Sequence, residues 1–160
     1  MFRAPWLWGA SKMGDFDFDV ILNNLPFLWA GMQMTFLLTA LAMAGGIVIG
    51  TFLALARLSS IRVLSLASMA YVDFFRSLPL ILVIFWFYFL VPLVLGQAVG
   101  GFYSVLIAFT LFEAAYYGEI IRAGISSVRS GQVAAAKALG MTYAQSMRYI
   151  VLPQAFRAMT

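Results

Sequence analysis

Only a few ionisable side chains interrupt the apolar stretches of this sequence. The stretch 102–125 contains Glu113, Glu119 and Arg122. A charged group inside a hydrocarbon layer is costly, so each of them is a candidate functional residue. Glu119 and Arg122 are three residues apart, a spacing that places both on one helix face, and we expect them to pair. Glu113 has no opposite charge at this spacing, so it pairs with another helix, stays protonated or lines a polar translocation path.

Arg76 introduces a positive charge ahead of another apolar stretch. The positive charge of Arg76 would attract an acidic solute, although we prefer to interpret Arg76 as an anchor at the membrane interface. The sequence contains no Cys and no His, which removes thiolate and imidazole ligands. It also lacks a GxxxxGK[ST] motif and any recognisable group of nucleophile, base and orienting residue. We therefore expect no enzyme activity, metal site or cofactor in this chain.

The composition is that of an integral membrane protein. Hydrophobic residues make up 64% of the 160 residues and charged residues 10%, and the mean hydropathy is +0.96. A soluble domain is about half apolar and a quarter charged. The net charge of +4 comes from basic residues spread along the chain. This spread argues against nucleic-acid binding and suggests a role in membrane topology.

We predict an all-α bundle with three membrane-spanning helices, each near the ~20 apolar residues that a crossing needs. The predicted spans are residues 29–55, 72–95 and 102–125. A short interfacial helix is expected before the second span, and Pro92 and Gly96 are expected in the turn after it. An extracytoplasmic segment, 1–19, then precedes one membrane domain, 20–160.

Small residues recur at every fourth position within the first predicted span. These positions are Ala42, Gly46, Gly50 and Ala54. Such a stripe lets two helix backbones approach closely. We expect it to form an interface with a neighbouring helix or subunit.

The loop 126–153 carries helix stop and start signals in quick succession. Ser130 is expected to N-cap a short helix, and Gly140 to end it in the left-handed conformation. Thr142 and Gln145 have the spacing of a capping box. Leu152-Pro153 is expected to interrupt the second helix. Two short helices around a glycine elbow either pack on their own protein or dock into a partner's groove.

The loop resembles the coupling loop, or EAA loop, of the membrane subunits of ABC importers. The family's spacing is matched by Ala134, Ala135, Ala136, Gly140, Ile150, Leu152 and Pro153. Ala134 stands where the family has glutamate, so the contact should depend on packing more than on an ion pair. The stretches 73–80, 112–125 and 138–142 are similar to polar amino-acid permeases, most of all to glutamate/aspartate permeases.

The resemblance implies the fold of a type I ABC importer permease, in a bacterial plasma (inner) membrane. It implies coupling through the loop to a dimer of ATP-binding subunits, which would hold the ATP and magnesium. It also implies an identical or homologous second permease subunit, an extracytoplasmic solute-binding protein and contact with membrane lipid. Seven residues follow Pro153, so a fourth span would only begin here, and we expect a C-terminally truncated permease.

The distribution of basic residues predicts the orientation. Arg3 and Lys12 precede the first span, and the other eight of the ten basic residues fall on the side of the 126–153 loop. The positive-inside rule then places this loop in the cytoplasm and the N-terminus outside. Two other classes of function remain open: a truncated assembly or interaction module that does not transport, and an ion-coupled transporter that uses Glu113.

Overall fold

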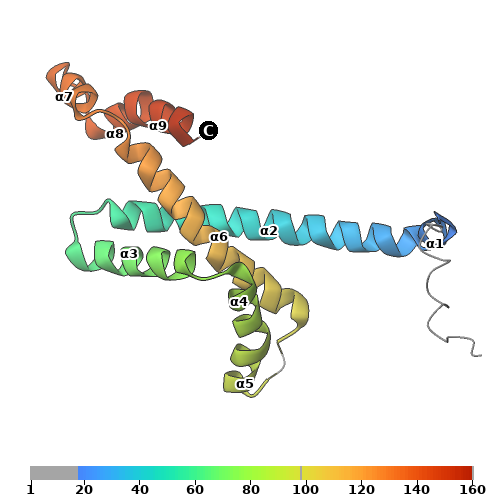
Figure 1. Cartoon of the computed structure of the whole chain (residues 1–160). Helices are drawn as coiled ribbons and strands as arrows, with labels where there is room; N and C mark the ends of the chain where they lie inside the picture. The colour runs from blue at the N-terminus through green and yellow to red at the C-terminus, as the bar shows by residue number, and fades with distance from the viewer. Residues whose placement is uncertain (1–17, 98, 160) are drawn as a thin grey trace, which may run out of the picture. The chain divides into compact units, whose positions relative to one another are not determined.

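The computed structural model describes residues 18–97 and 99–159, whose regular structure is entirely helical (Figure 1). The first helices are α1 (Phe18–Asn23), α2 (Leu25–Arg57) and α3 (Arg62–Ser77). They are followed by α4 (Leu80–Phe85), the π-helical segment η2 (Trp86–Leu90), α5 (Val91–Leu95) and α6 (Gly101–Ser126). The last elements are α7 (Ser130–Ala138), α8 (Tyr143–Ser146), the π-helical segment η3 (Met147–Val151) and α9 (Leu152–Met159).

The chain forms two compact units. The first, Met1–Leu37, contains α1 and the beginning of α2, whose apolar side chains are exposed. The predicted extracytoplasmic segment 1–19 lies outside the described residues, apart from the backbone of its last two positions. The second unit, Leu38–Thr160, contains every site considered below.

Two described helices, α2 and α6, are each long and apolar enough to cross a membrane. They contain the predicted spans 29–55 and 102–125. The second predicted span differs from the structure, because α3 and the helix from Leu80 to Leu95 meet at an angle of 102°. Leu78, which precedes Pro79, takes the extended conformation that a following proline favours. The bend therefore has a local cause. The predicted second span is a single span only if α3 and the helix from Leu80 to Leu95 cross the membrane together as a bent pair.

Two prolines predicted to stop helices lie inside continuous helical segments. Pro92 follows η2 and Pro153 follows η3, each two residues after the wide turn ends. The Val91 amide donates to the Trp86 carbonyl and the Leu152 amide to the Met147 carbonyl, five residues back in both cases. A proline ring collides with the carbonyl four residues earlier in a regular α-helix, and a π-turn is a known way to bend past such a position. The expected stops at Pro92 and Pro153 were therefore wrong, whereas Gly96 does end α5 with a φ of 65°.

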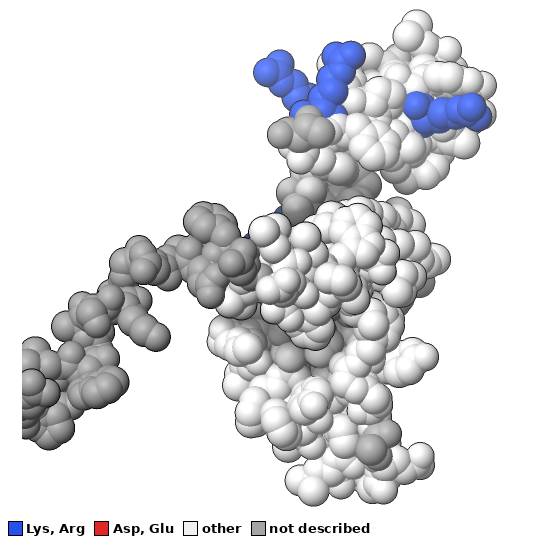
Figure 2. All heavy atoms as spheres, turned by 90° about the vertical axis from the view of Figure 1, so that its right-hand side faces the viewer, with Lys and Arg blue, Asp and Glu red and all other residues white. Residues whose placement is uncertain are grey.

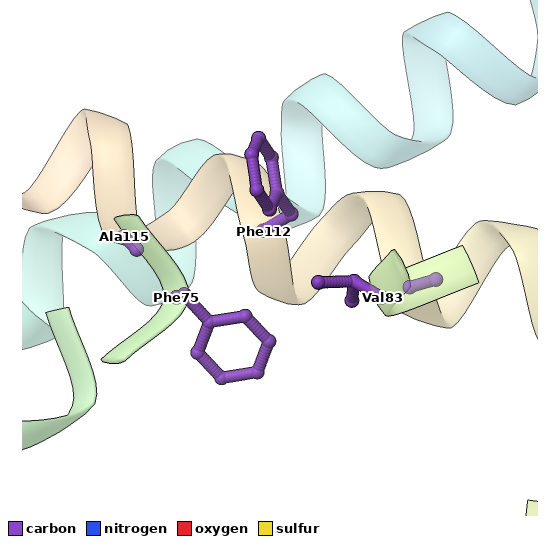
Figure 3. Close-up of a cluster of buried hydrophobic side chains, with 5 residues drawn as sticks. Phe75, Val83, Phe112 and Ala115 are labelled. Atoms are coloured by element: carbon purple, nitrogen blue, oxygen red, sulfur yellow. The ribbon is translucent and has the colours of Figure 1, made fainter. Parts of the chain in front are cut away.

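The buried core of the second unit joins α3, α4 and α6. It consists of Phe75, Val83, Ala108, Phe112 and Ala115 (Figure 3). Phe75 comes from the end of α3 and Val83 from α4, on opposite sides of the bend, and the others come from α6. The Tyr71 hydroxyl also donates to the Leu111 carbonyl at 2.8 Å. These contacts hold both arms of the bend against α6.

Candidate functional site

The small-residue stripe of α2 lies against α6. All four stripe residues are buried, and they are the buried residues of α2. A Cβ at Gly50 would lie 2.9 Å from the Ala114 carbonyl oxygen and from the Gly118 nitrogen, and one at Gly46 would lie 2.9 Å from Glu113 Cβ. The two helix backbones thus approach too closely for any side chain at Gly50. The stripe packs within this chain, and this packing fixes where the polar residues of α6 lie.

A buried charge cluster joins the end of α2 to α6. Arg122 donates to both carboxylate oxygens of Glu119, at 2.9 and 2.6 Å, which confirms the pair expected from their spacing. Arg57, in the last turn of α2, donates to the same carboxylate at 2.7 Å. All three side chains are largely buried. Arg57 was not predicted as a partner, because it lies 62 residues away from Glu119 in the sequence.

Arg76 of α3 packs on the turn of α6 that follows Glu113. The Arg76 guanidinium lies over the ring of Tyr116, 5.7 Å from its centroid. Tyr116 is three residues after Glu113 on α6 and is exposed. Glu113 is partly exposed, and no hydrogen bond or ion pair joins its carboxylate to another described residue. Within the described chain, neither Arg76 nor Glu113 takes part in a close ion pair.

The predicted elbow between α7 and α8 is built by backbone hydrogen bonds. Gly140 has a φ of 76°, and its amide donates to the Lys137 carbonyl. The Met141 amide donates to the Ala136 carbonyl at 3.1 Å, which completes a Schellman motif. The Thr142 and Gln145 side chains each accept from the other residue's amide, as the capping box predicts. The expected Ser130 cap is not formed, because α7 already begins at Ser130 and Arg129 makes no side-chain cap.

The residues predicted to couple this loop to a partner divide into exposed and buried positions. Ala134, Ala135 and Gly140 are exposed, as is Leu139 at the tip, with 81% of its surface accessible. Leu152 and Pro153 are also exposed, and Ile150 is half-buried. Ala136 is 1% exposed and packs inside the chain, so it is unavailable to a partner. The available surface is therefore the Ala134–Ala135 side of α7 together with the elbow.

The elbow is fixed to α6 through α9. Ala155 of α9 is fully buried, and a Cβ at Gly124 of α6 would collide with Met159 and the Ala155 carbonyl. The Gln154 amide donates to the Gln132 side-chain oxygen at 2.7 Å, linking α9 to α7. Contacts thus run from α7 through α9 to the end of α6.

Positive charge gathers at the end of the second unit that carries the elbow. The Lys and Arg side chains that stand out on the face in Figure 2 lie over this end, and no Asp or Glu is seen there. Residues 120–159 contain five basic residues and no acidic residue. A surface of this kind suits the cytoplasmic side of a membrane protein.

Comparison with known proteins places the chain among transport components. Residues 46–160 match the family model of the binding-protein-dependent transport system inner membrane component. The chain is 49% identical over 154 residues to the glutamate/aspartate import permease protein GltK of Escherichia coli O6:H1, covering 92% of this chain and 69% of GltK. It is 38% identical to the probable glutamine ABC transporter permease protein GlnM of Bacillus subtilis, covering 87% of this chain and 64% of that relative.

A solved structure has the same fold. A crystal structure of an amino acid ABC transporter with histidines superimposes with a TM-score of 0.82 and 36% sequence identity. The match covers 91% of this chain and 67% of that one.

Proposed function

Because this chain belongs to the family of inner membrane components of binding-protein-dependent transport systems, the permease subunits of ABC importers, we propose that it imports an acidic amino acid, glutamate or aspartate. The support for this substrate is the 49% identity to a relative named for glutamate and aspartate import. The energy would come from ATP and magnesium bound by a separate dimer of ATPase subunits. A second permease subunit and an extracytoplasmic solute-binding protein would complete the importer.

The observation that carries the proposed coupling to an ATPase is the shape of the elbow. Gly140 and the Thr142–Gln145 capping box fix two short helices at a sharp turn, and Leu139, Ala134 and Ala135 present an apolar surface of mostly small residues. Small side chains allow a close approach by a groove on another protein. The contacts of α9 with α7 and α6 then provide a route for motion from the elbow to the membrane-crossing helix.

Arg76 and Glu113 supply the two signs of charge that an amino-acid substrate needs. A glutamate or aspartate molecule carries an ammonium group and two carboxylates, so it needs both signs of charge in its site. We assign the ammonium group to Glu113 of α6 and a carboxylate to Arg76, which lies over the ring of Tyr116 one turn further along α6. This assignment explains how Glu113 can lie in the path of an acidic substrate. The Glu113 carboxylate would bind the ammonium group of the substrate and not its carboxylate side chain.

The coupling role is tested by co-purification with the ATPase. Ala135→Trp and Gly140→Val should abolish recovery of the co-expressed ATPase, because the first obstructs the docking surface and the second strains a left-handed residue by ~1 kcal/mol or more. Ala30→Trp, the same change on an exposed position of α2, is the control. Both elbow variants should still insert in the membrane. ATPase binding retained in both variants would contradict the docking role and favour the assembly module.

The substrate assignment is tested by uptake of labelled aspartate into vesicles that contain the assembled importer. Arg76→Gln and Glu113→Gln should each weaken the apparent affinity, by about tenfold or more if each removes a charged hydrogen bond worth ~1.5–3 kcal/mol. Arg62→Gln changes an exposed arginine at the start of α3, the helix that carries Arg76. The importer with this variant should transport aspartate normally. Unchanged uptake in both variants at every pH would leave Arg76 as an interfacial anchor and Glu113 as a tolerated residue. ATP-independent uptake abolished by a proton uncoupler would instead indicate an ion-coupled transporter.

A further inference from the structure

A cavity of about 440 Å³ lies beneath the elbow, where the ends of α2 and α6 meet α7, α8 and η3. Its walls are mostly apolar and include Leu58, Ile125 and Val133. Four residues with polar side chains also line it: Ser59, Lys137, Tyr143 and Ser146. An apolar cavity of this size with a few polar groups is typical of a binding site for a small molecule.

A second cavity of about 410 Å³ adjoins the first, because the two share Leu55, Ile125 and Met147 in their walls. It lies among α2, α6 and α9 and is almost wholly apolar. Its one hydroxyl, that of Thr51, already donates to the Ile47 carbonyl at 2.7 Å. No polar group in this wall therefore needs a ligand. The two cavities together are called the interface groove.

The two ends of the interface groove differ in chemistry. The apolar end is formed by the two helices that are long enough to cross a membrane, and the other end carries a lysine. Residues 120–159 include five basic and no acidic side chains, and of these Lys137 lines this end. A molecule that complements both ends has an apolar tail and an anionic head.

Ser146 is a polar residue of the groove wall whose hydroxyl is not satisfied by the described residues. The residue is 3% exposed and lies in the groove wall, and its hydroxyl has no hydrogen-bond partner among the described residues. A buried hydroxyl without a partner is unfavourable, and such groups are normally satisfied by protein, water or ligand.

We propose that the interface groove binds one anionic phospholipid, with its acyl chain between α2, α6 and α9 and its phosphate beside Lys137. A soluble anion would leave the apolar end unfilled, and an uncharged lipid would leave the basic end without a counter-charge. The bound lipid would bridge the elbow to the membrane-crossing helices. Basic pockets between membrane helices on the cytoplasmic side commonly bind anionic headgroups.

Native mass spectrometry of the full chain tests this proposal, after equilibration with equal amounts of phosphatidylglycerol and phosphatidylethanolamine in detergent. The unaltered chain should retain one phosphatidylglycerol in preference to phosphatidylethanolamine. Val133→Trp fills the groove and should abolish this retention, whereas Leu139→Trp, on the exposed tip nearby, should not. Excess glycerol phosphate should not displace the lipid, because it cannot fill the apolar end.

Substitution of the lysine separates charge recognition from acyl-chain binding. Lys137→Gln should reduce the preference for phosphatidylglycerol by about fivefold, which corresponds to ~1 kcal/mol for one basic residue near a membrane surface. Arg129→Gln removes an exposed charge outside the groove and should preserve the preference. The proposal is wrong if the unaltered chain retains both lipids equally, if Val133→Trp and Leu139→Trp behave alike, or if glycerol phosphate displaces the lipid.

Discussion

Replacing Gly50 with alanine should weaken the packing of α2 on α6. The added Cβ would lie 2.9 Å from the Ala114 carbonyl oxygen, the Gly118 nitrogen and Tyr117 Cβ, and two of these atoms belong to the backbone. Because backbone atoms cannot rotate away, the helices must separate. Overpacking of this kind costs about 1–3 kcal/mol, and the higher helix propensity of alanine offsets about 1 kcal/mol of it. The expected net loss in unfolding free energy is about 1 kcal/mol.

Gly31→Ala is the matched control, since it makes the same chemical change in the same helix. No described atom lies within 4 Å of the Cβ that it would add. This variant should show only the gain in helix propensity, about 1 kcal/mol. The two variants should therefore differ by about 2 kcal/mol in unfolding free energy.

Reversible unfolding in mixed detergent micelles, followed by helical circular dichroism, would measure this difference. Gly50→Leu should be less stable than Gly50→Ala, while Val48→Leu, at an exposed position of α2, should change little. If Gly50→Ala and Gly31→Ala unfold at the same detergent fraction, the close approach of α2 and α6 does not contribute to stability.

Three further predictions concern the charge cluster, the elbow and the orientation. Glu119→Gln should lower the unfolding free energy by roughly 2 kcal/mol, because it leaves two largely buried arginines without their carboxylate; an unchanged unfolding curve would contradict this reading. Thr142→Ala should cost about 1 kcal/mol by removing the capping box, and faster amide hydrogen exchange confined to α8 would show it. Single cysteines at Ser11 and Ser130 of this cysteine-free chain should be labelled by an impermeant reagent in intact cells only at Ser11. Labelling at Ser130 alone would reverse the predicted topology.

Local features of this protein were predictable from the sequence because neighbouring residues determine them. Gly140 ends a helix through its own backbone freedom, and the Thr142–Gln145 box needs only two side chains three positions apart. The pairing of Glu119 with Arg122 likewise follows from one helical turn. The apolar lengths of α2 and α6 gave the membrane class and two of the spans.

Other features depend on contacts between segments that are distant in the sequence, so local sequence patterns could not predict them. Arg57 reaches Glu119 because the stripe of α2 packs on α6, and no local spacing relates the two residues. Ala136 is buried although its neighbours on α7 are exposed, since the packing beneath the elbow selects one side of that helix. Pro92 and Pro153 continue helices that their sequence predicted to end, because each follows a wide turn that moves the obstructing carbonyl. A proline limits its own backbone, and the hydrogen-bond pattern of the turn before it determines whether the helix stops or continues.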